Sequence, residues 1–162
     1  MEPTLAPHKQ RCLPPAAYSE VGAICSITAA TRDRLPVFSD PGFACAGVEV
    51  LRERATETRV PVYGYCFMPD HLHLVIGPSP KRDVVSFVGQ VKNLIQREGW
   101  KRGLRGRIWQ ESFWDHFLRG DEQVESVVEY VLNNPVRRGI VSECHDYPFA
   151  GSLMFDVRPS RQ

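Results

Sequence analysis

Two histidines separated by one residue, His71 and His73, are the first candidates for chemistry in this sequence. They lie in the segment MPDHLHLVI of residues 68–76, whose apolar and β-forming residues predict a strand. Side chains at i and i+2 of a strand project to the same face, so both imidazoles point the same way. Two such imidazoles are two-thirds of a divalent-metal site. A pair of partly exposed surface histidines is the alternative that a bare His-x-His motif leaves open.

A tyrosine and an asparagine on one predicted helix are the second candidates. Tyr130 and Asn134 stand four residues apart in VVEYVLNNP of residues 127–135, which places one above the other on a single helix face. An Asn side-chain oxygen suits the completion of a His/His site for Mg²⁺ or Mn²⁺. A phenol beside such a metal is a candidate nucleophile toward a phosphodiester, given a nearby cation or base. A tyrosine that only packs the helix on a sheet is the alternative.

A basic segment with neighbouring aromatic residues is the third candidate. Residues 92–107 contain one acidic residue, Glu98, and six basic residues: Lys92, Arg97, Lys101, Arg102, Arg105 and Arg107. Trp109 follows directly, and Arg137 belongs to a second basic cluster. Cations that follow a phosphate backbone, interleaved with rings on which bases stack, suit single-stranded nucleic acid. A solvated helix face is the alternative.

Asp115 and His116 come just after this segment, in a stretch dense in aromatic residues. Either side chain is a candidate to orient a ligand histidine or to move a proton. A purely structural role is the alternative for both.

The elements that must position these residues follow from hydrophobic periodicity and turn signals. We expect strands at about 23–29, 60–68, 71–76 and within 108–118, and helices at about 43–58, 84–97 and 122–134, the last capped by Asp121 and ended by Pro135. The order β-α-β-β-α-β predicts an α+β, ferredoxin-like antiparallel sheet with helices on one face, followed by a C-terminal helix that carries Tyr130. The chain after position 141 is expected to be irregular. We expect a flexible arm over 1–17, one domain over 18–152 and a short tail over 153–162.

The composition is that of an ordinary globular protein, with 162 residues, 43% hydrophobic and 24% charged. No apolar run approaches the roughly 20 residues that span a bilayer, and the N-terminus has no secretory apolar region, so a cytoplasmic protein without membrane contact is expected. The five cysteines are scattered and form no Cys-x-x-Cys pair, which predicts reduced thiols rather than disulfides or a zinc ribbon.

Taken together, the motifs resemble the REP-associated tyrosine transposases. The similarity rests, in order, on YCFMPDHLHL (65–74), Lys92, IWQ (108–110), WDH (114–116) and YVLNNPVR (130–137), and it runs from about residue 18 to residue 152. That family consists of bacterial relatives of the small single-strand transposases of insertion sequences, within the HUH endonuclease superfamily.

The resemblance implies a mechanism and a substrate. His71, His73 and Asn134 would hold Mg²⁺ or Mn²⁺, and Tyr130 would attack DNA to give a 5′-phosphotyrosine and a free 3′-OH, which can later be rejoined. The substrate would be hairpins of palindromic repeats with adjoining single-stranded DNA, contacted by the basic segment, Trp109 and Arg137. The protein would act at the bacterial nucleoid, as a monomer or a homodimer.

Two other functions stay open at the level of sequence. One is a domesticated protein that binds hairpin DNA without cutting it. The other is a metal-dependent phosphohydrolase with water as nucleophile, although a third alternating histidine is missing because position 75 is Val.

Overall fold

A five-stranded antiparallel sheet forms the centre of the chain in the computed structural model, which describes residues 22–119 and 122–154. Its strand order is β4-β1-β3-β2-β5. The strands are β1 (Cys25–Ala30), β2 (Val62–Met68), β3 (His71–Ile76), β4 (Trp114–Phe117) and β5 (Ala150–Gly151). The α-helices are α1 (Pro41–Thr58), α2 (Val84–Lys101), α3 (Val124–Leu132) and α4 (Asn134–Arg137), and short 3-10 turns are η2 (Arg32–Arg34), η3 (Val37–Ser39) and η4 (Cys144–Asp146). The predicted α+β fold and its β-α-β-β-α-β order are confirmed.

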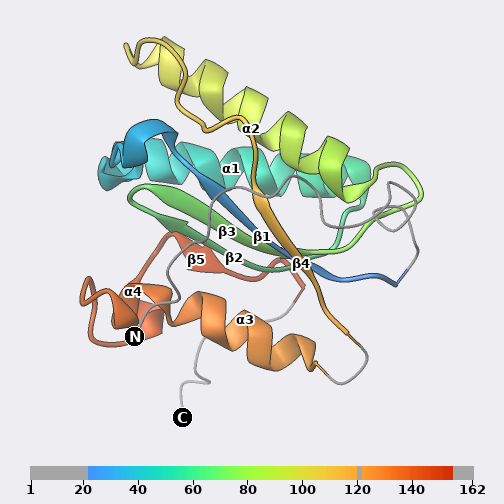
Figure 1. The fold of residues 1–162 in the computed structure, drawn as a ribbon. Helices are drawn as coiled ribbons and strands as arrows, with labels where there is room; N and C mark the ends of the chain where they lie inside the picture. Colours follow the sequence, from blue (N-terminus) through green and yellow to red (C-terminus); the bar gives the residue numbers. More distant parts are fainter. Residues whose placement is uncertain (1–21, 120–121, 155–162) are drawn as a thin grey trace.

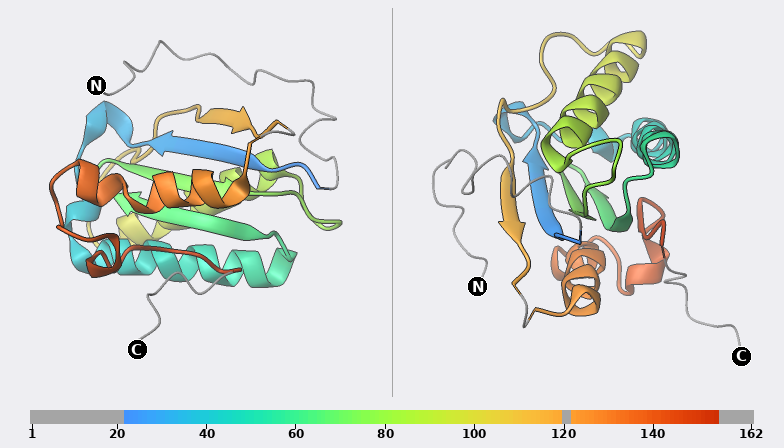
Figure 2. Two further views of the ribbon diagram at one scale, coloured as in Figure 1. Left: turned by 90° about the horizontal axis from the view of Figure 1, so that it is seen from below. Right: turned by 90° about the vertical axis from the view of Figure 1, so that its right-hand side faces the viewer.

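The helices form two layers on opposite faces of the sheet. The helices α1 and α2 cover one face, whereas α3 and α4 lie against the other (Figures 1 and 2). The larger core fills the α1/α2 side and includes Leu72, Leu74 and Ile76 of β3. Val75 belongs to a second core under α3. Because side chains alternate along β3, His71 and His73 share the face of Val75 and point toward α3 and α4.

The close seating of α3 depends on a glycine in β2. A Cβ on Gly64 would lie only 3.1 Å from Val128 Cγ1 of α3, so the missing side chain lets the helix approach the sheet. Val128 and Val131 are the buried residues of α3, and they pack this helix against β2 and β3, the latter being the strand that carries both histidines.

Helix boundaries differ from expectation at two places. The helix α2 continues beyond Arg97 to Lys101, which carries Trp100 onto its last turn. The predicted 122–134 helix begins at Val124, with Gln123 at its N-cap position, and divides into α3 and α4 at Asn133. Pro135 occupies the first turn of α4, where its missing N–H is tolerated, instead of ending the helix. The predicted cap Asp121 and the predicted arm over 1–17 lie outside the described residues.

The segment after position 141 is more regular than expected. The Tyr147 hydroxyl donates to the Phe67 carbonyl, and the Phe67 N–H donates to the Phe149 carbonyl at 2.9 Å. These contacts align Ala150 with Cys66 and create the edge strand β5. In the described ranges, no helix is long and apolar enough to cross a membrane.

Candidate active site

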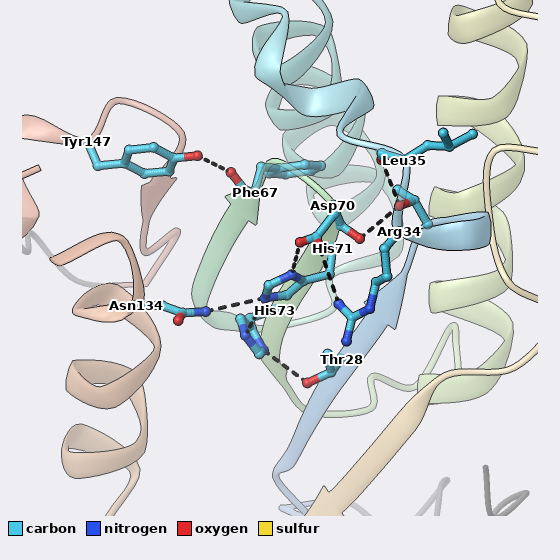
Figure 3. Close-up of polar contacts among 10 residues, drawn as sticks. Thr28, Arg34, Leu35, Phe67, Asp70, His71, His73, Asn134 and Tyr147 are labelled. Atoms are coloured by element: carbon cyan, nitrogen blue, oxygen red, sulfur yellow. Dashed lines mark hydrogen bonds and ion pairs between the residues drawn. The ribbon is translucent and has the colours of Figure 1, made fainter. Parts of the chain in front are cut away.

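The side chains of the two histidines of β3 lie close together at the interface between the sheet and α4. His71 Nε2 and His73 Nε2 are 3.0 Å apart, and their rings are nearly perpendicular at 89° (Figure 3). Asn134, the first residue of α4, places its Nδ2 3.4 Å from His71 Nε2. Without a metal, the Nε2–Nε2 separation is a hydrogen bond in which one imidazole N–H donates to the other ring. The structure therefore brings together all three residues of the predicted metal site.

The Nδ1 atom of each imidazole forms a hydrogen bond with another polar side chain, which orients the ring. Asp70 Oδ1 lies 2.6 Å from His71 Nδ1, which donates to the carboxylate and leaves its Nε2 lone pair for a ligand. Thr28 Oγ1 of β1 lies 2.9 Å from His73 Nδ1. Arg34 of η2 approaches the other Asp70 oxygen at 3.6 Å. Thr28, Asp70 and Arg34 had no assigned role in the sequence, although Asp70 directly precedes the histidine motif. Thr28 is brought to His73 only by the register of β1 with β3.

The electrostatics of the site keep its donors available for a cation. Burial lowers the pKa of His73 to about 3, and the positive charges of Arg137, Arg138 and Arg34 act in the same direction. The ring is therefore neutral at physiological pH, as a metal-bound histidine must be. The hydrogen bond from His71 lowers the pKa of Asp70, so this carboxylate stays ionised.

The geometry of the donors fits a small divalent cation. Two ligand atoms that each lie about 2.1 Å from an ion and at right angles to one another are about 3.0 Å apart, which is the observed Nε2–Nε2 separation. The Asn134 amide requires only a rotation that exchanges its nitrogen and oxygen to present an oxygen donor. No group of three or more His, Cys, Asp or Glu that could hold a metal occurs in the part of the chain that the structure describes. The mixed set of His71, His73 and Asn134 is therefore a candidate for cation binding by its donor geometry.

Tyr130, the predicted nucleophile, lies near the C-terminal end of α3. Its side chain is 56% exposed, and the Arg137 guanidinium stacks on its ring at 3.7 Å from the centroid. Arg137 Nη1 also donates to the Tyr130 carbonyl at 2.7 Å. The same Arg137 lies close enough to lower the pKa of His73, so one cation neighbours both the phenol and the histidines. Asn134, four residues after Tyr130 but in α4 rather than α3, is buried, whereas Tyr130 is open to solvent.

Two residues predicted to contact DNA instead fasten the loop after α2 to the helix. Trp109 is only 6% exposed and packs in the main core against Phe38, so the expectation of a surface stacking ring there is wrong. Its Nε1 donates to the Lys92 carbonyl at 3.0 Å, and Lys92 Nζ donates to the Gln110 carbonyl at 2.8 Å. Burial lowers the pKa of Lys92 to about 8. The other five predicted cations of the segment are exposed: Arg97, Lys101, Arg102, Arg105 and Arg107.

Neither predicted supporting residue of β4 reaches the histidines. Asp115 pairs with Ile27 and therefore faces the α1/α2 side, opposite to His71 and His73. The prediction that it orients a ligand histidine is wrong, because the pleat of β4 turns it to the other face. His116 is on the α3 face but is exposed, and its Nε2 lies 3.0 Å from Glu122.

Comparisons with known proteins found a matching family, two curated relatives and a solved structure of similar fold. The model of a family described as transposase IS200-like matches residues 22–134. A REP-associated tyrosine transposase of Escherichia coli K12 is 29% identical over 103 residues, 64% of this chain and 58% of that protein. A Haemophilus influenzae protein assigned to the same kind is 27% identical over 104 residues, 57% of this chain and 58% of that protein. A solved REP-associated tyrosine transposase, bound to a REP hairpin, superposes with a TM-score of 0.66 at 22% identity, over 88% of this chain and 81% of that one. The chain thus spans 58% of the length of either curated relative.

Proposed function

Because the chain belongs to the family of IS200-like transposases, we propose that it is a metal-dependent endonuclease that cleaves and rejoins single-stranded DNA beside hairpins. The observation that carries the proposal is the convergence of His71, His73 and Asn134, together with an exposed tyrosine, Tyr130, four residues before Asn134 in the chain. A similar fold has been solved with a REP hairpin bound, which supports hairpin DNA as the partner.

In the proposed reaction, three residues bind a metal ion and a fourth residue attacks the DNA. His71, His73 and Asn134 would hold Mg²⁺ or Mn²⁺, and the bound ion would polarise the scissile phosphate. Tyr130 Oη forms a bond to phosphorus while the P–O3′ bond breaks, which leaves a 5′-phosphotyrosine and a free 3′-OH. The phenol proton leaves to solvent, to which the exposed ring has access, and the departing 3′ oxygen takes up a proton. Rejoining is the reverse attack by a DNA 3′-OH, which needs no nucleotide cofactor.

Arg137 supports the nucleophile in two ways. Its contact with the ring limits the rotation of Tyr130, and its charge stabilises the phenolate that forms during attack.

The test is the formation of a covalent protein–DNA adduct. The full chain is incubated with hairpin oligonucleotides that carry single-stranded flanks, labelled at the 3′ end in one set and at the 5′ end in another, with and without Mn²⁺. A 5′-phosphotyrosine retains the 3′ label on the protein and releases the 5′-labelled fragment. Tyr130→Phe and His71→Ala should both abolish the adduct, whereas the matched control Tyr63→Phe should leave it unchanged.

The outcomes separate the proposal from its alternatives. Tight hairpin binding without an adduct in any divalent metal would identify a DNA-binding protein that does not cut. Cleavage that persists in Tyr130→Phe and yields a free 5′-phosphate would identify water as the nucleophile.

A further inference from the structure

An exposed indole ring stands at the end of α2, on a face that the site described above does not use. Trp100 is 54% exposed, whereas Trp109 is buried and Trp114 is half-buried. A large aromatic side chain so open to water contributes little to the core and leaves its ring accessible to a ligand.

The ring is held in place rather than free to rotate. Trp100 Nε1 donates to the Gly106 carbonyl at 2.9 Å, and Gln96 Nε2 donates to the same carbonyl at 3.0 Å. Gln96 Oε1 in turn accepts from the Ile108 N–H at 2.7 Å. The loop after α2 is therefore fastened to the helix at two points, and the indole is fixed beside it. A surface whose side chain is already ordered loses less conformational entropy when a ligand binds.

The surroundings of the ring are cationic. Arg105 and Arg107 flank the Gly106 carbonyl to which the indole is bonded, and Arg97 stands one helical turn before Trp100. All three arginines are exposed. An exposed aromatic face bordered by guanidinium groups suits a ligand that has a flat ring and a negative backbone, and it disfavours an apolar partner.

This surface lies at the same end of the molecule as the histidines. The Arg32 N–H donates to the Ile108 carbonyl at 2.7 Å, which joins the loop after α2 to η2. From η2, Arg34 reaches Asp70 at 3.6 Å, beside His71. Figure 1 shows the end of α2, η2 and α4 at one end of the sheet. Arg32 and Arg34 of η2 thus connect the loop after α2 with Asp70.

We propose that Trp100 is a stacking platform for an unpaired base of single-stranded DNA, whose phosphates follow Arg105, Arg107 and Arg32 toward the His71/His73 site. The choice of DNA rests on the proposed function, but the platform itself rests on the exposure, anchoring and charge around Trp100.

The test compares the affinity for two labelled DNAs by fluorescence anisotropy. One DNA is a hairpin with a single-stranded flank, and the other is the same hairpin without the flank. All proteins are full chains in a Tyr130→Phe background, so that cleavage does not interfere. We expect Trp100→Ala to weaken binding of the flanked hairpin by roughly 5- to 100-fold, the range for loss of one stacked base. Binding of the unflanked hairpin should change much less.

Two further variants make the result specific. Trp100→Phe keeps a stacking ring but removes the N–H that donates to Gly106, and it should retain most of the affinity. Met154→Ala is the matched control, since Met154 is similarly exposed at 52% but follows the edge strand β5. Circular dichroism and thermal melting of each variant verify that it is folded, and DNA should quench the Trp100 fluorescence that the Phe variant lacks.

The inference is overturned if Trp100→Ala binds the flanked hairpin as tightly as Met154→Ala does. It is also overturned if Trp100→Phe is as weak as Trp100→Ala, because loop anchoring rather than stacking would then explain the loss. Either result would leave the proposed function intact if the chain that retains Tyr130 forms the covalent adduct. A chain that binds none of the DNAs would overturn both.

Discussion

Removal of the Asp70 carboxylate should weaken metal binding without dismantling the site. Asp70 accepts the Nδ1–H of His71 at 2.6 Å, which fixes the tautomer whose Nε2 lone pair faces His73. In Asp70→Ala the ring is free to turn and its Nδ1–H loses its partner. In Asp70→Asn an amide oxygen can still accept the hydrogen bond, but the negative charge is lost. We therefore expect the alanine variant to be the weaker of the two.

The size of the effect follows from the position of the carboxylate. Loss of a partner behind a ligand histidine typically costs about 10- to 100-fold in metal affinity, or about 1.4 to 2.8 kcal/mol. The Asp70 side chain is 26% exposed, so water partly replaces it and the lower end of this range applies. For Asp70→Ala we expect the Mn²⁺ dissociation constant to rise about 10-fold, and for Asp70→Asn by a smaller factor.

Isothermal titration of the full chain with Mn²⁺, in the absence of DNA, measures this change directly. His71→Ala should remove the binding and serves as the reference for a lost ligand. Asp33→Asn is the matched control, because Asp33 is an exposed carboxylate that pairs with Arg32 instead. If Asp70→Ala bound Mn²⁺ within twofold of the unmodified chain while His71→Ala did not bind, the reasoning about orientation would be refuted.

Three further predictions concern stability. A Cβ on Gly47 would lie 2.6 Å from Phe67 Cε1, so Gly47→Ala should overpack α1 against β2 and lower the free energy of unfolding by about 1 to 3 kcal/mol; an unchanged denaturant midpoint would contradict this. Tyr147→Phe leaves the buried Phe67 carbonyl without the hydroxyl that donates to it and should cost about 1 to 3 kcal/mol, with a melting temperature lower by roughly 2 to 4 °C per kcal/mol. Burial lowers the pKa of Lys92 from 10.5 to about 8, so between these pH values the unfolded chain binds the extra proton and stability should rise with pH. Denaturation series from pH 7 to 10 should show this rise in the unmodified chain but not in Lys92→Met; equal slopes would rule it out.

Much of the fold was predictable because local patterns and tertiary packing agree. Side chains alternate along HLHLVI, so Leu72, Leu74 and Ile76 of β3 enter one core and Val75 enters the other. The helical spacing of apolar residues predicted α1 and α2. The relation to the small transposases of insertion sequences was also predicted from the motifs, and the match of residues 22–134 to the IS200-like family confirms it. The edge strand β5 was missed because two residues carry no periodicity, and its position depends on the distant pairing with Cys66 and Tyr65.

The same distinction applies to the candidate site: local periodicity predicts some of its features, and contacts between distant segments determine the others. The sequence by itself determined that His71 and His73 share a face, because this follows from the period of a strand. It also predicted Tyr130 and Asn134 on one helix, but the structure divides that helix at Asn133. Only the tertiary structure decided which residues lie behind the histidines and which aromatic ring is exposed. Those outcomes depend on strand register and on burial, which join segments far apart in the chain: Thr28 reaches His73 across β1 and β3, Asp115 turns away, and Trp100 rather than Trp109 faces solvent.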